Sequence, residues 1–203
     1  MYIIDSGSLY NVWIDLLAKV TQEGQVVDGE IKEILDVCIV FRNTEKNEEI
    51  LNLHSFLRKN TEEMRKVFFS DASNEFGHSY LNKIKGPRWK NDCSDIVELL
   101  AREPESKKAT LTLIGNGDGN VPCLNVIHFL NRNGKMYVKY FARGQDVYRK
   151  FYADAICVYE MAQKVANQLQ INLQTITGFI SSAHIYCEHE NEIKNILKYY
   201  PSI

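Results

Sequence analysis

Residues 121–146, VPCLNVIHFLNRNGKMYVKYFARGQD, contain the pattern that decides the fold. Two strand-like runs, LNVIHFL at 124–130 and KMYVKYFA at 135–142, flank the segment Arg132-Asn133-Gly134. An Asn-Gly pair between two alternating runs is a strong signal for a β-hairpin. We therefore predict two antiparallel strands here, with Cys123 at the start of the first strand.

Helix and strand signals continue on both sides of this hairpin. Between the N-cap candidates Ser6 and Ser8 and the stop signal Gly24, apolar residues recur at helical spacing: Leu9, Val12, Trp13, Leu16, Leu17 and Val20. Further helices are predicted over residues 47–69, around 96–100 after the cap candidates Asn91 and Asp92, over about 154–169, and near the C-terminus. Strand-like runs lie at 35–42, 108–114 and 175–186, and a turn-rich segment occupies 70–92.

These elements predict an α+β fold. The 203 residues are 45% hydrophobic, which fits one sizeable core, and no internal repeat, low-complexity segment or linker divides them. We therefore predict a single layered domain over residues 1–203, with a mixed or antiparallel sheet and packed helices.

The charge balance excludes some classes of partner. The formal net charge is −2, whereas a surface for duplex DNA, RNA or anionic lipid needs an excess of Lys and Arg. A small phosphorylated ligand remains compatible, because two or three well-placed cations are enough to bind it.

The cysteines and the N-terminal segment indicate a reduced compartment. Five cysteines without a close-spaced pair argue against a disulfide framework or a four-cysteine zinc site, and we expect no metal. The segment MYIIDSGSLY lacks the apolar core of a signal peptide, and no apolar run has the length of a membrane span. We expect a cytoplasmic protein.

Cys123 is the first candidate for chemistry. It follows the polar, glycine-rich loop GNGDGNVPC at 115–123 and opens a strand. An arbitrary cysteine is more often an inert core residue. At a loop edge, however, it can be partly exposed, and nearby cations would favour the nucleophilic thiolate. The spacing alone leaves both interpretations open.

Three motifs taken together resemble the thymidylate synthase family. They are VPC at 121–123, YFARGQD at 140–146 and SAHIY at 182–186, and their order and spacing match the family. The segment FYADA at 151–155 falls in register between them without a gap. The resemblance covers roughly residues 74–190, is weak over 1–70, and is nearest to the short archaeal-type members.

The resemblance implies a substrate and a reaction. Cys123 stands at the position of the nucleophilic cysteine, which adds to carbon 6 of the pyrimidine of a nucleoside monophosphate. That addition makes carbon 5 a nucleophile toward the one-carbon unit of methylene-tetrahydrofolate. Arg143 matches the arginine that holds the phosphate, where a cation would also lower the pKa of the thiol. Gly144 replaces the serine that usually follows this arginine.

The resemblance also implies a homodimer. Lys107 and Lys108 stand where the partner subunit of the family donates two arginines to the phosphate. The charge is retained there, but the bidentate geometry of arginine is lost. Taken alone, the two lysines would be interpreted as a solvated corner between a helix and a strand.

Further residues match the sugar, folate and proton-transfer positions of the family. His184 and Tyr186 alternate along a strand, so they share a face, and they match the pair that hydrogen-bonds the sugar hydroxyl. Asp146 matches an acid that meets the pterin ring of the folate. Glu63 is aligned with the catalytic glutamate that relays protons through water, with Glu62 as the fallback, and a solvated helix acid is the alternative for both.

Asp154 departs from the family pattern. Thymidylate synthases keep an asparagine here, which can donate to and accept from uracil. A carboxylate instead accepts from the amino group of cytosine, and cytidylate hydroxymethylases of the family are similar in carrying an aspartate. The alternative interpretation is a helix N-cap, and the two roles can coexist.

Two other departures concern the folate and the phosphate. The tryptophan-bearing loop of the family is largely deleted before Phe76-Gly77, and Val26-Val27-Asp28 stand near the place of the phosphate-loop arginine. Nucleotide binding is therefore supported by more residues than folate binding.

Three functions follow from these residues. The first is an enzyme that hydroxymethylates carbon 5 of CMP or dCMP with methylene-tetrahydrofolate. The second is a thymidylate synthase that methylates dUMP, and the third is a non-catalytic nucleotide-binding paralogue. Asp154 favours the first over the second, and the intact Cys123, Arg143, His184 and Tyr186 argue against the third.

Overall fold

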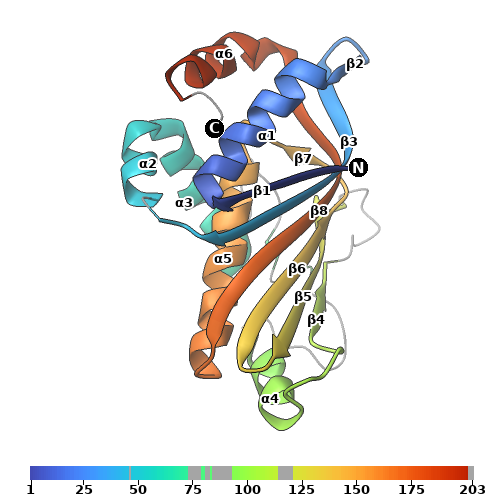
Figure 1. Ribbon diagram of the computed structural model, residues 1–203, viewed down its shortest axis with the longest axis vertical. Helices are drawn as coiled ribbons and strands as arrows, with labels where there is room; N and C mark the ends of the chain where they lie inside the picture. The colour runs from blue at the N-terminus through green and yellow to red at the C-terminus, as the bar shows by residue number, and fades with distance from the viewer. Residues whose placement is uncertain (46, 73–78, 81–82, 84–92, 114–120, 201–203) are drawn as a thin grey trace.

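A mixed β-sheet forms the frame of the protein (Figure 1). The computed structural model describes residues 1–45, 47–72, 79–80, 83, 93–113 and 121–200. The strand order is β1 (Tyr2–Ser8), β3 (Ile31–Asn43), β8 (Asn172–Tyr186), β6 (Lys135–Ala142), β5 (Leu124–Arg132) and β4 (Thr110–Thr112). Two short strands add to it, since β2 (Gln25–Val27) pairs with β3 and β7 (Gln145–Asp146) pairs with β8.

The sheet combines parallel and antiparallel pairs, as the α+β prediction requires. β1 is parallel to β3, and both β6 and β7 are parallel to β8. β3 is antiparallel to β8, and β4, β5 and β6 form an antiparallel succession. The predicted hairpin is confirmed: Arg132 pairs with Lys135, and Asn133 and Gly134 both have positive φ, 52° and 71°. Positive φ at both turn residues is what a type I′ hairpin needs.

Helices cover one face of this sheet. α1 (Leu9–Glu23) packs on β1 and β3, and α5 (Phe151–Gln168) packs on β8 and β6. α3 (Ser55–Phe69) lies on α5, and α2 (Asn47–Leu53) lies beside α3 (Figure 1). α4 (Ser94–Arg102) contacts α5, and α6 (Glu190–Tyr199) contacts α1. Helix α1 agrees with its prediction, with Ser8 as N-cap and Gly24 as C-cap.

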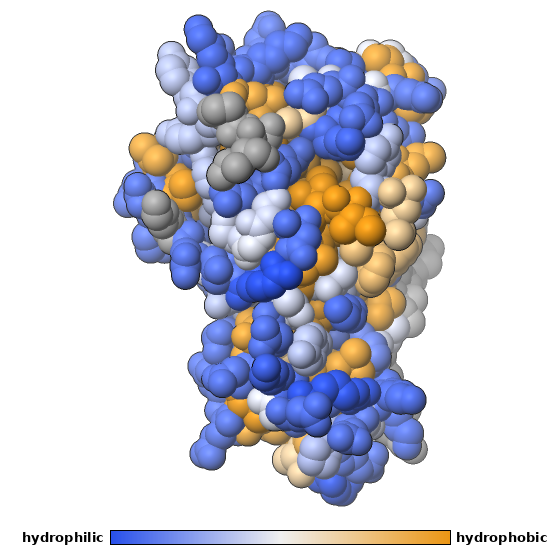
Figure 2. Space-filling view, viewed as in Figure 1, coloured by the Kyte–Doolittle hydropathy of each residue, from blue (hydrophilic) through white to orange (hydrophobic). Residues whose placement is uncertain are grey.

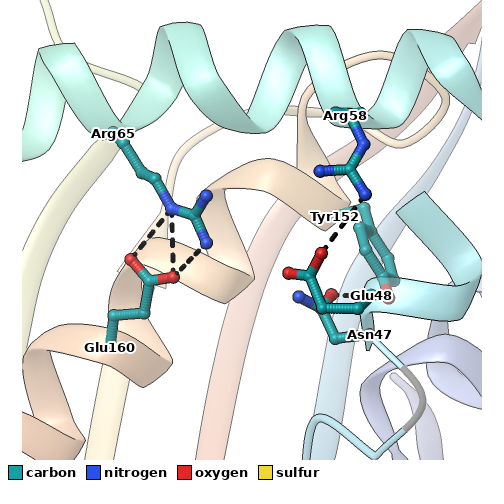
Figure 3. Close-up of polar contacts among 6 residues, drawn as sticks. All are labelled: Asn47, Glu48, Arg58, Arg65, Tyr152 and Glu160. Carbon is teal, nitrogen blue, oxygen red and sulfur yellow. Dashed lines mark hydrogen bonds and ion pairs between the residues drawn. The ribbon is translucent and has the colours of Figure 1, made fainter. Parts of the chain in front are cut away.

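The interface between α3 and its neighbours combines apolar packing with surface ion pairs (Figure 3). Arg65 donates to both carboxylate oxygens of Glu160 on α5, with its shortest bond at 2.5 Å. Arg58 pairs with Glu48 of α2 at 3.2 Å. These side chains are between 35% and 71% exposed, so each pair contributes roughly 0–1 kcal/mol, and the buried apolar face of α3 holds the helix in place.

Three predicted elements differ from the structure. The helical stretch 47–69 is broken at His54, whose backbone is non-helical (φ −119°, ψ 85°) and whose ring packs edge-on against Trp13, with the ring centroids 5.6 Å apart. Helix α5 begins at Phe151 rather than near residue 154, and the strand predicted over 108–114 is ordered as β4 only over Thr110–Thr112. The cap candidates Asn91 and Asp92, Phe76-Gly77 and most of the 115–123 loop lie outside the described residues.

Candidate active site

Cys123 and Arg143 lie together at one end of the β5–β6 hairpin. Cys123 directly precedes β5 and is half-buried, while Arg143 directly follows β6. The antiparallel pairing brings the two backbones together, and the N–H of Arg143 donates to the carbonyl of Cys123 at 2.9 Å. The guanidinium of Arg143 donates to the carbonyls of Pro122 at 3.1 Å and Val121 at 2.7 Å. Arg143 therefore lies against the loop that carries the thiol.

The environment of Cys123 favours the protonated thiol over the thiolate. Burial raises the pKa of the thiol above its ordinary value, and the charge of Asp154 raises it further. Arg143 and Lys150 lower it, but they do not outweigh burial. Arg143 therefore lowers the pKa of Cys123, as expected of a nearby cation, but burial raises that pKa by more. Thiolate formation needs a proton acceptor or a change in solvation when substrate enters.

Asp154 lies inside the first turn of α5, so it is not an N-cap. Its backbone N–H donates to the carbonyl of Lys150 at 2.9 Å, and Lys150 itself occupies the N-cap position. The carboxylate is 5% exposed. Its Oδ2 accepts from Nε2 of Gln145 at 2.7 Å, whereas Oδ1 is buried without a hydrogen-bond partner among the described residues.

This half-satisfied carboxylate is costly to the fold. Burial raises the pKa of Asp154 from 3.8 to about 6, against the lowering effects of the Gln145 hydrogen bond and of Lys150. A buried acceptor without a donor costs about 1–3 kcal/mol, and nearly all such groups in folded proteins have a partner. A ligand with an N–H or O–H group at Oδ1 would remove that cost.

The predicted sugar-binding pair shares one face of β8. The rings of His184 and Tyr186 meet edge to face, with centroids 5.8 Å apart. Asp146 pairs with His184 across β7 and β8, and a Cβ placed on Gly144 would lie 3.9 Å from Cε1 of His184. Nδ1 of His184 is buried without a partner in the described part of the chain. The strand pairing therefore joins the motifs around Arg143 and His184 into one site.

Asp146 is already engaged by Arg149. The Arg149 backbone N–H donates to Oδ1 at 3.0 Å and its Nε donates to Oδ2 at 2.6 Å. The Arg149 guanidinium also lies over the Tyr186 ring, 4.6 Å from its centroid. Each carboxylate oxygen has a second lone pair, so Asp146 can still accept from a donor on a pterin ring.

Glu63 and the two lysines lie apart from this cluster of contacts. Glu63 is on α3, where its Oε1 accepts a hydrogen bond from Nζ of Lys66 at 2.5 Å. None of the hydrogen bonds described above for the cluster involves Glu63. The fallback Glu62 is exposed. Lys107 and Lys108 are exposed between α4 and β4, a position that suits presentation to a second chain.

Two residues of the cluster were missed by the sequence analysis. Gln145 carries the hydrogen bond to Asp154, yet in the sequence it is one polar residue inside a motif. Tyr80 is buried against the site: burial and the charges of Asp154 and Cys123 raise the pKa of its hydroxyl, which accepts a backbone hydrogen bond from Leu124. Tyr80 belongs to the turn-rich segment, where periodicity gives no signal.

The α+β fold and the cluster around Cys123 can be compared with those of known families. The family model described as thymidylate synthase matches residues 31–202. The chain therefore belongs to the thymidylate synthase family, whose members bind a nucleoside monophosphate, use methylene-tetrahydrofolate as one-carbon donor and usually work as dimers.

Archaeal relatives match nearly the whole chain. A protein of Methanocaldococcus jannaschii is 26% identical over 218 residues, covering 99% of this chain and 97% of its own length. A protein of Methanosarcina barkeri is 25% identical over 206 residues, covering 97% and 94%. A protein of Methanothermobacter marburgensis is 22% identical, covering 97% and 98%. All three carry the name "Putative thymidylate synthase".

Two further features concern membranes and metals. Among the described residues, no helix has both the length and the apolar character needed to cross a membrane. In the same residues, no three His, Cys, Asp or Glu side chains gather as a metal site would require.

Proposed function

We propose that the protein is a pyrimidine nucleotide C5 hydroxymethyltransferase that acts on CMP or dCMP. The observation that carries this proposal is Oδ1 of Asp154, a buried acceptor with no partner among the described residues, in a cluster with Cys123. The exocyclic amino group of cytosine supplies the missing donor. Uracil places a carbonyl at the same position, and two facing acceptors repel each other.

Cys123 and Glu63 are the proposed catalytic residues, although Glu63 lies outside the cluster of contacts around Cys123. Cys123 loses its proton and forms a bond to carbon 6, which places the electron pair on carbon 5. Carbon 5 takes a one-carbon unit, which methylene-tetrahydrofolate supplies. Once carbon 5 has lost its proton and the bond from the transferred carbon to the folate nitrogen has broken, the exocyclic carbon would be a methylene, with Cys123 still bonded to carbon 6. Water would add to this methylene, and departure of the Cys123 sulfur from carbon 6 would restore the ring double bond and leave the hydroxymethyl product. Glu63 is the proposed proton relay in these steps.

The remaining candidates bind and orient the ligands. Arg143 beside Cys123 holds the phosphate through charge-assisted hydrogen bonds. His184, with its unpartnered Nδ1, and Tyr186 hold the sugar hydroxyl. Asp146, oriented by Arg149, meets the pterin ring of the folate.

We also propose a homodimer, which completes the phosphate site with Lys107 and Lys108 of the second chain. Register places an apolar row across the sheet on the face opposite α5: Ile3, Cys38, Phe179 and Phe141. Ile3 is 66% exposed, Phe179 43% and Phe141 40%. A hydrophobic patch lies among hydrophilic residues near the middle of the molecule (Figure 2). An exposed patch of this kind suits burial against another copy of the chain.

The thymidylate synthase reaction on dUMP is the second candidate, because the archaeal relatives carry that name. The two reactions are distinguished by incubating the protein with CMP, dCMP or dUMP and methylene-tetrahydrofolate. Product mass and tritium release from carbon 5 are then followed for each nucleotide. Hydroxymethylated cytidylate supports the proposal, dTMP supports the second candidate, and nucleotide binding without either product supports a non-catalytic protein.

The dimer is tested by complementation. A Cys123→Ser chain is expected to be inactive alone, and a Lys107→Ala/Lys108→Ala chain to be about fivefold to tenfold less active than wild type at nucleotide concentrations below KM. In a mixed dimer, one of the two sites combines an intact Cys123 with intact lysines and should recover activity. A monomer in sedimentation at micromolar concentration, with full activity, would contradict this arrangement.

A further inference from the structure

Gln145 is fixed as firmly as any residue of the cluster. It is 1% exposed and belongs to β7, where it pairs with Ala183 of β8 while the next residue, Asp146, pairs with His184. Its Nε2 donates to Oδ2 of Asp154 at 2.7 Å. The two side chains come from different elements, so the bond ties the start of α5 to the sheet directly beside the candidate base-binding position.

This bond makes the two oxygens of Asp154 unequal. An amide N–H can only donate, so Oδ2 is held as an acceptor. When the carboxyl carries a proton, that proton therefore belongs on Oδ1, which has no partner among the described residues. The oxygen that lacks a partner in the described part of the chain and the oxygen that gains or loses the proton are therefore the same atom.

We propose that Gln145 is a positioning residue for base selection, which presents Oδ1 of Asp154 to the pyrimidine as the single titrating oxygen. Ionised Oδ1 accepts from the amino group of cytosine. Protonated Oδ1 donates instead, and a donor fits the carbonyl of uracil. The preference between cytidylate and uridylate then depends on the proton at this one atom. The inference rests on the proposed function, because it assumes that Asp154 contacts the base.

The surroundings of Asp154 place this proton exchange within reach of ordinary assays. Burial raises the pKa of Asp154 to about 6. The titratable groups that interact with it come from several elements packed around it: Lys150, Asp146, Cys123, Tyr80, Tyr140 and Cys157. The Gln145 bond and Lys150 lower the pKa of Asp154, and Asp146 raises it. Ionised Oδ1 therefore dominates above pH 6 and neutral Oδ1 below it.

The test measures binding rather than turnover, so it needs no folate. Calorimetry gives Kd for CMP and UMP, and for dCMP and dUMP, from pH 5 to pH 8.5. The proteins are wild type, Asp154→Asn, Gln145→Met and the control Gln163→Met. Methionine keeps the length of glutamine without its donor. Gln163 lies on the outer side of α5 and donates to Asn167 at 2.8 Å, so the control loses a similar hydrogen bond away from the site.

In wild type, the preference for cytidylate over uridylate should grow as pH rises through about 6. Gln145→Met removes the donor that lowers the pKa of Asp154, so the same change should occur about 0.5 to 1 pH unit higher. Its preference at pH 7 should fall roughly threefold to tenfold, and Gln163→Met should match wild type. A purely structural role for Gln145 would weaken binding of both bases equally without moving the pH midpoint.

Each outcome separates this inference from the proposed function. If wild type prefers cytidylate, and Asp154→Asn abolishes the preference, but Gln145→Met keeps the wild-type midpoint and ratio, only the role of Gln145 is refuted. A wild-type preference that stays constant from pH 5 to pH 8.5 also refutes it, whether or not the variants fold. Gln145→Glu, which keeps shape and adds an acid, should move the midpoint upward and serves if the methionine variant is unfolded. A wild type that prefers uridylate at every pH refutes the proposed function itself.

Discussion

The two ends of the candidate site differ in how complete they are within one chain. At the base end, Gln145 is 1% exposed and Asp154 5% exposed, and their hydrogen bond is in place. At the phosphate end, Arg143 is exposed and bonds to carbonyls of its own loop, and Lys107 and Lys108 are exposed on a distant corner. The base end is therefore preformed within one chain, whereas the proposed phosphate end would need the ligand and a second chain to complete it.

This difference has an energetic side. A buried carboxylate with an unpartnered oxygen destabilises the folded chain, while exposed cations cost the fold almost nothing. A group that destabilises the fold is expected to contribute to binding or chemistry. Substitution of Asp154 should therefore change both function and stability, whereas substitutions at the phosphate end should change function alone.

The largest effect is expected from Cys123→Ser at the base end. Loss of the nucleophile should reduce tritium release from carbon 5 by at least about 10³-fold, because the addition to carbon 6 cannot start. The free energy of unfolding should change by less than about 1 kcal/mol, since the two side chains are nearly isosteric. Cys187→Ser, at another half-buried cysteine, is the control and should keep full exchange. Retained exchange in Cys123→Ser would exclude the covalent mechanism.

Asp154→Asn should stabilise the protein without ligand. The pKa of Asp154 is higher in the folded state, about 6, than its ordinary value of 3.8, so its contribution favours folding below pH 3.8 and is lost as pH rises through 6. At pH 8 the neutral amide should therefore raise the free energy of unfolding by roughly 3 kcal/mol, and the gain should vanish near pH 4. Denaturant titrations at several pH values measure this.

Glu160→Gln is the matched control on the same helix. Glu160 is 35% exposed and paired with Arg65, so its loss should change stability by less than about 1 kcal/mol. Equal changes in the free energy of unfolding for Asp154→Asn and Glu160→Gln would show that burial of the Asp154 carboxylate does not destabilise the fold.

At the phosphate end, Lys107→Ala/Lys108→Ala should raise the KM for the nucleotide by about fivefold to tenfold, since two charge-assisted contacts are lost. The effect should shrink at high salt, where exposed charges are screened. The free energy of unfolding should stay within about 0.5 kcal/mol of wild type. An unchanged KM for the nucleotide would show that these lysines do not contact the phosphate.

The smallest effect is expected from Gly144→Ser, which restores the serine of the family. A Cβ at Gly144 meets Cε1 of His184 at 3.9 Å, an ordinary contact, so the substitution should fit without strain. One added phosphate hydrogen bond of about 1 kcal/mol should lower the KM up to about fivefold. A higher KM would show that the phosphate does not lie beside this position.

The sequence predicts elements whose signals are local. The hairpin follows from Asn133-Gly134, and α1 follows from its apolar spacing between Ser8 and Gly24. The start of α5 was missed because Lys150 caps it without a side-chain hydrogen bond. Strand β1 was missed because it is held by parallel pairing with residues 37–43 of β3, a partner that local pattern does not reveal.

The candidate site also combines residues that the sequence identifies with contacts that only the folded chain creates. The motifs that contain Cys123, Arg143 and His184 can be found in the sequence because their order is diagnostic. The hydrogen bond between Gln145 and Asp154 forms because the fold brings β7 against the start of α5. The hydrogen bond from Arg149 to Asp146 forms because the chain turns between these two residues. Such contacts are products of tertiary structure, and no residue spacing encodes them.

The most direct measurement is the ratio of kcat/KM for cytidylate over uridylate in wild type and Asp154→Asn, with CMP against UMP and dCMP against dUMP. Losing a buried hydrogen bond to a charged group and leaving an unpaired acceptor costs roughly 2–4 kcal/mol, or about 30- to 1,000-fold. Wild type should therefore prefer cytidylate by a factor in that range at pH 8, and Asp154→Asn should reverse or abolish the preference with Cys123 chemistry intact. A wild type that prefers uridylate, or a ratio that the substitution leaves unchanged, would contradict base recognition by Asp154 and make the thymidylate synthase reaction the leading function.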